Sequence, residues 1–234
     1  MIKIAMFSDL DGSMIYGKDK FTQDEEKIAM SWLNGENLMF STKAQHNIYS
    51  LFKESCEYIP VTARSKKNFF NTHFSKDKHL KHYVVSLGAE ITIHNEVDEE
   101  WSQNIKNLYE KYNINLSLLF EQLKNLFKNE KHIKIETNDD FFVKIKYPKS
   151  NKEETLKIVK RFEHLIDREV LDIVSQKKKI VIKPFFLNKE EAVKYMIKKL
   201  NIETTIGIGD NHYYDGPFLE LMDFKLFHEK MDLI

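Results

Sequence analysis

The sequence predicts an α/β fold, in which a Rossmann-like parallel sheet with flanking helices forms a core and a smaller α+β unit, the cap, is inserted into that core. Short apolar runs alternate with helical patterns at both ends of the chain, as expected of a parallel sheet covered by helices. The middle of the chain instead combines helices with half-exposed strands, and the alternating pattern resumes after Pro184. We therefore expect a discontinuous core of residues 1–95 and 184–234 and a cap of residues 96–183.

The core strands are predicted from apolar runs of strand length, and the core helices from apolar residues at helical spacing. Helical spacing occurs around residues 44–52 and 192–200. Because helical patterns separate most of the strand-like runs, we expect parallel strands with helical connections. The runs are residues 2–7, 58–62, 83–87, 205–208 and 224–227.

The cap is predicted to be a mixed unit because its patterns change from helical to alternating. The predicted helices are residues 101–112, 116–127 and about 153–166. The predicted strands are residues 141–147, 170–174 and 180–183. The first of these strands alternates apolar and polar side chains, as in a half-exposed antiparallel sheet. Residues 16–40 have no clean period, and we assign no structure to them.

Composition excludes several classes of partner. The 234 residues include 36 basic and 36 acidic side chains, so no global field would attract nucleic acid or an acidic membrane surface. The single cysteine, Cys56, gives no internal disulfide. No window approaches 18 consecutive apolar residues, and the first apolar stretch is too short for a signal peptide. We expect a cytoplasmic protein that binds neither nucleic acid nor membranes; the sequence carries no signal for an oligomeric state.

Two acidic residues, Asp9 and Asp11, directly follow the first predicted strand. Residues two apart in an extended chain point to the same side, and Gly12 permits a tight turn that leaves its amide free. Two carboxylates so close together repel each other unless a cation or a shared proton offsets the charge. The alternative is a plain Asp-Gly turn at the end of a strand.

More acids occur at the end of a later strand. The predicted strand at residues 205–208 leads into Asp210, and Asp215 follows five positions later. Ligands of open parallel sheets bind beyond the carboxyl ends of the strands, so we expect Asp9, Asp11 and Asp210 to lie together. Three carboxylates without a histidine or cysteine cluster favour magnesium over zinc.

Three further residues are candidates for holding an anion. Thr62 offers a hydroxyl at a strand end near backbone amides, although a helix N-cap is the commoner use of such a threonine. Lys189 follows Asn188, which with Glu191 forms a box-like helix start. A cation is unfavourable at that end of a helix, which favours a separate role for Lys189. Arg64 could bind a substrate anion in bidentate fashion or form a structural salt bridge.

Four segments resemble, in order, the four motifs of the haloacid dehalogenase superfamily: FSDLDGSMI at Asp9, VTARS at Thr62, the helix start at Lys189, and GIGDNHYYD at Asp210. The first and fourth motifs are specific, whereas the second and third would mean little alone. VVSLGAEITIHN followed by DEEW is similar to the Cof-like branch, which includes sucrose-phosphate phosphatases. In that branch an α+β (type IIB) cap enters between the second and third motifs.

This resemblance implies a magnesium-dependent phosphatase that hydrolyses a small phosphorylated metabolite, with a sugar phosphate as the best-matching class. Asp9 is then the nucleophile that forms an aspartyl-phosphate, and Asp11 is the acid/base. The resemblance assigns the magnesium ion to Asp9, Asp210 and the carbonyl of Asp11. It assigns the phosphate to Thr62, Lys189 and the amide of Gly12, and it gives Asp215 the role of orienting Lys189 or a metal-bound water.

The sequence departs from the family pattern at three places. Ser13 stands where threonine is usual but keeps a hydroxyl. The acids of the fourth motif are five apart where four is usual, which makes Asn211 an alternative to Asp215 as a ligand. Residues 16–40 are longer than the usual connection and could form a flap over the site.

Two other functions remain open at this point. A phosphomutase of the same superfamily would return phosphate to a second hydroxyl of its substrate. A non-catalytic phospho-acceptor or binding module, such as a receiver domain, also combines aspartates with a threonine and a lysine. Receiver domains are shorter and phosphorylate an aspartate after a later strand, so the position of Asp9 and the large insert favour the enzyme.

Overall fold

The computed structural model describes residues 3–148, 151–176 and 178–227. The chain divides into two compact units, one of Met1–Ser102 with Asn188–Ile234 and one of Gln103–Leu187. The boundary at which the second unit begins falls inside α3 (Glu99–Lys111), seven residues after the boundary that the sequence predicted. The reason is that the start of this helix packs against the first unit. The Trp101 indole nitrogen donates to the Gly88 carbonyl at 2.9 Å, and its ring packs against Tyr195.

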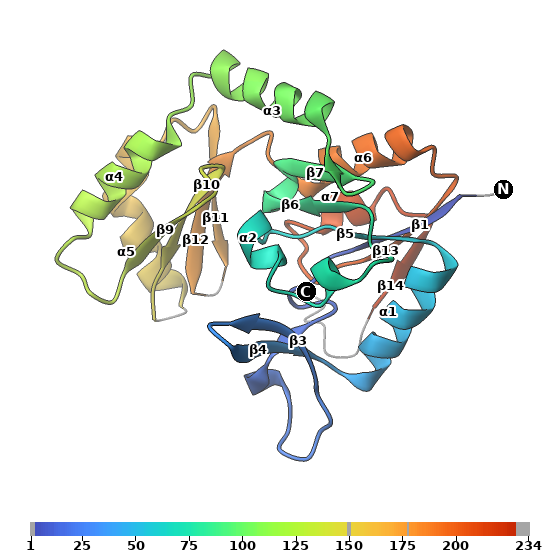
Figure 1. Cartoon of the computed structure of the whole chain (residues 1–234). Helices are drawn as coiled ribbons and strands as arrows, with labels where there is room; N and C mark the ends of the chain where they lie inside the picture. Colours follow the sequence, from blue (N-terminus) through green and yellow to red (C-terminus); the bar gives the residue numbers. More distant parts are fainter. Residues whose placement is uncertain (1–2, 149–150, 177, 228–234) are drawn as a thin grey trace. The chain divides into compact units, whose positions relative to one another are not determined.

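The first unit contains a four-stranded sheet in the order β14-β13-β1-β5, in which every neighbouring pair is parallel. This confirms the predicted parallel core. The chain passes from β1 to β5 on one side and later to β13 on the other, so the strand order reverses between β1 and β13, where α/β sheets bind ligands. Helices α1 and α6 lie on opposite sides of the sheet (Figure 1). These elements are β1 (Ile4–Ser8), α1 (Lys43–Ser55), β5 (Glu57–Pro60), α6 (Lys189–Leu200), β13 (Thr204–Ile208) and β14 (Phe224–Leu226).

One predicted core strand joins the parallel sheet only at its edge. β6 (Tyr83–Val85) pairs antiparallel with β7 (Glu90–Ile93), which pairs with β8 (Glu96–Val97), and it lies parallel to the segment just after β5 through the bridge Val61–Val84. The reason is the short turn Ser86–Gly88, whose three residues all have positive φ and send the chain back along β6.

The segment that had no sequence assignment forms a small antiparallel sheet in the order β2-β4-β3. Its hairpin turns at Asn34 and Gly35, with φ values of 51° and 83°, and an Asn-Gly pair is the usual sequence of such a two-residue turn. This signal was present in the sequence. The elements are β2 (Tyr16–Gly17), the short helix η1 (Lys18–Lys20), β3 (Ile28–Leu33) and β4 (Glu36–Ser41). The same unit also contains the short helices α2 (Lys66–Phe69), η2 (Phe74–Lys76) and α7 (Gly216–Leu219).

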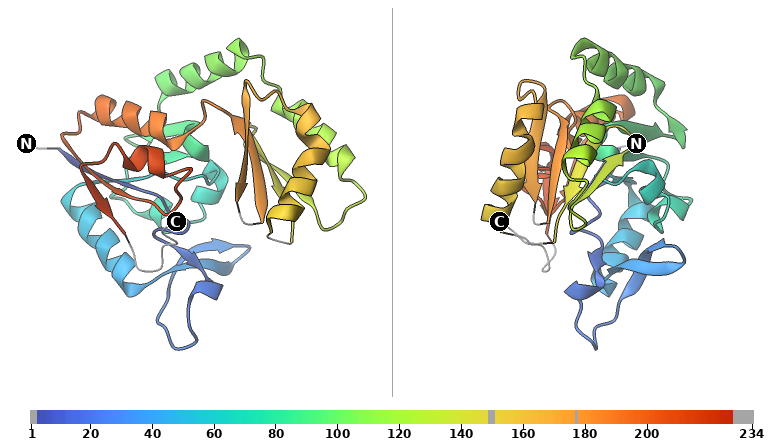
Figure 2. Two further views of the ribbon diagram at one scale, coloured as in Figure 1. Left: turned by 180° about the vertical axis from the view of Figure 1, so that it is seen from behind. Right: turned by 90° about the vertical axis from the view of Figure 1, so that its left-hand side faces the viewer.

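The second unit is an α+β structure with one antiparallel sheet in the order β11-β12-β10-β9. Figure 2 shows α4 and α5 on the same face of this sheet. The strand β9 was not predicted, because its polar sequence KIETN has no clear alternation. The elements are α4 (Leu116–Leu126), β9 (Lys134–Asn138), β10 (Phe142–Lys146), α5 (Lys152–Phe162), η4 (Glu163–Leu165), β11 (Leu171–Gln176) and β12 (Lys179–Pro184).

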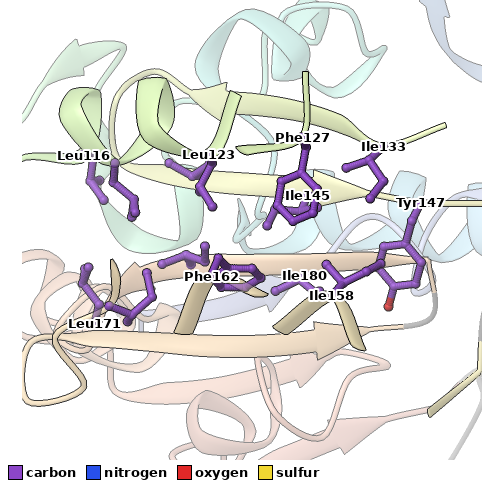
Figure 3. Packing of buried hydrophobic residues seen from close by; sticks show 14 residues of the cluster. Leu116, Leu123, Phe127, Ile133, Ile145, Tyr147, Ile158, Phe162, Leu171 and Ile180 are labelled. Carbon is purple, nitrogen blue, oxygen red and sulfur yellow. The ribbon is translucent and has the colours of Figure 1, made fainter. Parts of the chain in front are cut away.

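The hydrophobic core of the second unit lies between its two helices and its sheet. Figure 3 shows labelled side chains of α4, α5 and the strands pointing toward one another. Leu123 and Phe162 of the helices and Ile145 and Ile180 of the strands are completely buried. No helix in the described ranges combines the length and the apolar character that a membrane crossing requires.

Truncation of Phe162 tests this core. Because Phe162 is 0% exposed, Phe162→Ala is expected to lower the free energy of unfolding by about 3–5 kcal/mol, measured by urea denaturation. Leu156→Ala on the same helix is the matched control, since Leu156 is 49% exposed and its loss should change stability by no more than about 0.5 kcal/mol. Equal effects of the two substitutions would contradict this packing.

Candidate functional site

The site is built on Asp9, the residue that follows β1. Its backbone amide donates to the Ile208 carbonyl of β13 at 2.9 Å, so it lies at the carboxyl ends of two neighbouring strands. Its side chain is 7% exposed. One carboxylate oxygen, Oδ1, accepts a hydrogen bond from the Lys189 ammonium, and the other, Oδ2, accepts one from the Ser13 hydroxyl at 3.1 Å. Both oxygens of this buried aspartate are therefore held by other side chains.

Lys189 is the first residue of α6, and its side chain points into the site. The Asn188 side chain caps the helix by accepting from the Glu191 amide at 2.8 Å, as the sequence predicted. The Lys189 ammonium donates to Asp9 and to Oδ1 of Asp215, the second at 2.7 Å. Burial alone would lower the pKa of Lys189, but the charges of Asp215 and Asp9 outweigh burial and raise it. The unfavourable position at a helix N-terminus is thus explained by two acidic partners.

Asp215 and Asp210 complete the acidic group from the loop after β13. Asp215 is 1% exposed, and its Oδ2 accepts from the backbone amides of Asp210 at 3.1 Å and Asn211 at 2.9 Å. Carboxylate oxygens of Asp9, Asp210 and Asp215 lie within 4.8 Å of one another. Despite its unusual spacing in the motif, Asp215 therefore lies in the site and contacts Lys189.

Glycine is needed where this loop approaches the first motif. A Cβ atom at Gly12, which has a φ of +99°, would lie 2.2 Å from Oδ2 of Asp210. A Cβ atom at Gly209 would lie 2.5 Å from Cβ of Asp215. Side chains at either position would push the acids away from the site.

The group of acids carries more negative than positive charge. Burial raises the pKa of Asp9 most strongly; Lys189 opposes this shift, while Asp215 and Asp210 add to it, and the result is a pKa of about 8. Three buried or half-buried carboxylates against one ammonium leave an excess of two negative charges when all are ionised. Hard oxygen donors with this excess charge fit a divalent cation such as Mg²⁺. The Asp11 carboxylate, which the sequence grouped with these acids, is not part of the group.

Asp11 is instead paired with Arg64. The guanidinium donates to both carboxylate oxygens, from Nε and from Nη2, each at 2.6 Å. This is the bidentate geometry that arginine forms with carboxylates. The Asp11 side chain is 41% exposed, so it lies at the solvent side of the site. Of the two roles considered for Arg64, the structure shows the salt bridge.

Thr62 is buried near the carboxyl end of β5. Its hydroxyl oxygen accepts from the Arg64 amide at 3.2 Å, and it does not cap the following helix, since Ser65 is the N-cap of α2. The turn Ser86–Gly88 supports this segment from behind, because the Ser86 amide donates to the Arg64 carbonyl at 2.7 Å and the Leu87 amide to the Thr62 carbonyl at 3.2 Å.

Two expected contacts are corrected by the structure. The Gly12 amide is not free to bind phosphate, because it donates to the Ile15 carbonyl at 2.9 Å and closes the turn after the first motif. The Asn211 side-chain oxygen accepts from the Tyr213 and Tyr214 amides at 3.0 and 2.9 Å. It therefore stabilises its own loop, and it is a poor substitute for a carboxylate ligand.

Sequence reasoning missed supporting residues of Asp9. The Tyr58 hydroxyl donates to the Ser8 hydroxyl, which donates to the Asp9 carbonyl, each at 2.8 Å. The Gln45 side chain donates to the Ser13 carbonyl at 2.6 Å. Of these supporting residues, Gln45 has a recognisable sequence pattern: it follows Thr42 by three residues, which is the spacing of a helix capping box.

Comparisons by sequence and by structure gave different results. No protein-family model matches the sequence, and no curated protein matches it. Among solved structures, the sucrose-phosphatase of Synechocystis sp. PCC6803, determined in complex with sucrose and phosphate, is 13% identical, with a TM-score of 0.54 over 94% of this chain and 80% of that one. The C-terminal domain of C. albicans trehalose-6-phosphate phosphatase is 14% identical, with a TM-score of 0.60 over 93% and 73%.

A third similar structure is the N-terminally truncated IMP-nucleotidase of Plasmodium falciparum, which is 13% identical, with a TM-score of 0.52 over 100% of this chain and 71% of that one. These neighbours are phosphatases of the haloacid dehalogenase superfamily. The likeness to these structures confirms the predicted fold, a Rossmann-like parallel-sheet core with an inserted α+β unit.

Proposed function

We propose that this protein is a magnesium-dependent phosphatase that hydrolyses a phosphomonoester of a small metabolite, with a sugar phosphate as substrate, through an aspartyl-phosphate on Asp9. The observation that carries the proposal is the contact of Lys189 with both Asp9 and Asp215, beside Asp210, at the carboxyl ends of β1 and β13. A buried carboxylate held on both oxygens at a ligand-binding edge is a positioned nucleophile.

The reaction proceeds in two displacements. A carboxylate oxygen of Asp9 forms a bond to phosphorus while the bond from phosphorus to the ester oxygen breaks, and Asp11 protonates the leaving alcohol. A water molecule then attacks the phosphorus of the aspartyl-phosphate and gives a proton to Asp11, so that inorganic phosphate leaves and Asp9 is restored. Asp9, Asp210 and the Asp11 carbonyl would hold magnesium, which would supply charge neutralisation for the approach of two anions.

The other residues of the site bind the phosphate or orient the groups that bind it. Lys189 contacts Asp9 directly and so can hold a phosphate oxygen that arrives there, while Asp215 orients its ammonium. The Thr62 hydroxyl is a second candidate for a phosphate contact. Asp11 must leave its bidentate pair with Arg64 to carry a proton, and a bound phosphate can compete for the guanidinium, because arginine binds both anions in the same geometry.

The names of the similar structures support the proposed substrate class. Two similar structures are phosphatases whose names specify sugar phosphates, and the third is a nucleotidase. All three names describe small phosphomonoesters, which supports the same class here.

A purified preparation should release inorganic phosphate from sugar phosphates without forming an isomeric sugar phosphate, as judged by product analysis over a panel of phosphorylated metabolites. Isomer formation in place of phosphate release would favour the phosphomutase.

Replacement of the nucleophile is the direct test. Asp9→Asn removes the attacking oxygen while keeping the volume of the side chain, so turnover of a generic aryl phosphate should fall at least about 10³-fold. Asp24→Asn, at an exposed position, is the matched control and should keep full turnover. Circular dichroism should show that both variants are folded. Activity retained in folded Asp9→Asn would sink the assignment.

Metal removal tests whether the activity depends on magnesium. A chelator should abolish turnover, and Mg²⁺ but not Zn²⁺ should restore it, because the donor set consists of hard oxygens. Asp210→Asn should raise the Mg²⁺ concentration needed for half-maximal activity about 10-fold or more. Full activity in the presence of the chelator would exclude a metal-dependent mechanism.

A further inference from the structure

A line of hydrogen bonds runs from the start of α1 to the proposed nucleophile. The Gln45 Nε2 group donates to the Ser13 carbonyl at 2.6 Å, and the Ser13 hydroxyl donates to Oδ2 of Asp9 at 3.1 Å. Gln45 is 2% exposed and Ser13 is completely buried, so water does not compete for these bonds. We propose that Gln45 is a positioning residue that fixes the carboxylate of Asp9 through Ser13. The inference rests on the proposed function of Asp9 as nucleophile.

The chemistry of Gln45 supports this role. Gln45 is the third residue of a capping box at the start of α1, in which its Oε1 accepts from the Thr42 amide at 2.8 Å and its own amide donates to the Thr42 hydroxyl at 3.2 Å. A capping box needs only an acceptor at this position, and glutamate provides one equally well. The amide nitrogen of glutamine is explained by its second partner, the Ser13 carbonyl.

A second hydrogen bond anchors the turn that contains Ser13 to the segment before α1. The Ser41 hydroxyl, at the end of β4, donates to the Met14 carbonyl at 2.7 Å. Two successive carbonyls, those of Ser13 and Met14, are therefore anchored by the segment that joins β4 to α1. Inside the turn, the amides of both residues donate to the Leu10 carbonyl. The turn that carries the Ser13 hydroxyl is thus closed on itself and fixed from outside.

The consequence is a fixed orientation of the Asp9 carboxylate. Lys189 holds Oδ1 and Ser13 holds Oδ2, so the plane of the carboxylate is set from two sides. An error of about 1 Å in the position of a reacting group can cost about 10²-fold in rate. Removal of the Gln45 hydrogen bond should therefore reduce kcat and leave KM nearly unchanged, because the Gln45 side chain is buried and contacts Thr42 and Ser13.

Gln45→Glu is the sharpest variant, because it keeps the capping acceptor and replaces the donor by an oxygen that faces the Ser13 carbonyl. We expect kcat for an aryl phosphate to fall about 10-fold with KM within about 2-fold. Thr42→Ala is the matched control, since it removes the capping hydroxyl and leaves the side chain of Gln45 in place. The Thr42 hydroxyl also donates to Oε1 of Gln45 at 3.2 Å, but the Thr42 amide and the Ser13 carbonyl still hold the two ends of the Gln45 amide in this variant. The substitution should lower the melting temperature while kcat stays within about 2-fold. An equal fall of kcat in Thr42→Ala would reduce Gln45 to a capping residue and overturn the proposal.

A double-mutant cycle separates positioning from a general disruption of structure. If Gln45 acts through Ser13, the variant Ser13→Ala with Gln45→Glu should have a kcat no lower than that of Ser13→Ala alone. If the double variant instead loses kcat by the product of the two single-variant losses, the two residues act independently and the proposed path is wrong. The cycle, and a fall in kcat without a change in KM, both report on the path from Gln45 through Ser13 to Asp9. A residue with only a structural role would instead alter the melting temperature.

Crystal structures of the wild type and Gln45→Glu provide a test that needs no turnover. In the variant, the Ser13 hydroxyl should move out of hydrogen-bonding distance of Oδ2 of Asp9. A hydroxyl that stays in its wild-type position would overturn the positioning role whatever the activity of the protein. If the wild type has no phosphatase activity but the hydroxyl moves in the variant, the proposed function is overturned and the path from Gln45 to Asp9 stands.

Discussion

The contact of the Lys189 ammonium with two buried carboxylates is the interaction on which the site depends. Removing ions from water is costly unless their partners are close and fully hydrogen-bonded. Here Asp9, Lys189 and Asp215 come from the end of β1, the start of α6 and the loop after β13, so their pairing fixes three segments at once. Close packing around this pairing also requires glycine at positions 12 and 209, because side chains there would collide with Asp210 and Asp215 respectively.

A second constraint acts from the other side of the site. Ser86, Leu87 and Gly88 all have positive φ, a conformation that is unfavourable for side chains larger than glycine. The surroundings hold this turn in place: it donates to the carbonyls of Thr62 and Arg64, and a Cβ atom at Gly88 would lie 2.2 Å from the Asn188 carbonyl. The turn therefore joins the second motif to the N-terminus of α6. The cost of its backbone conformation is consistent with a role in aligning Arg64 and Lys189 rather than in packing alone.

The sequence predicted those features that depend on local order or on the ends of strands. Asp9 and Asp210 could be found because the carboxyl ends of parallel strands meet, and Lys189 because a cation conflicts with the start of a helix. The pairing of Asp11 with Arg64 could not, because it joins residues 53 positions apart, and neither residue type specifies its partner. The occupied amide of Gly12 and the polar strand β9 were missed because hydrogen bonds formed only in the folded chain decide both.

Gln45 illustrates why some of these residues cannot be found from the sequence. Its spacing from Thr42 indicates a helix cap, and that local explanation is correct. A primary amide, however, has an acceptor at one atom and donors at the other, so a local role can satisfy one end and leave the second for a distant partner. In this fold the second partner is the turn that carries Ser13, which joins the start of α1 to the proposed nucleophile. A side chain whose local role uses only half of its hydrogen-bonding groups is therefore a sound place to search for tertiary function.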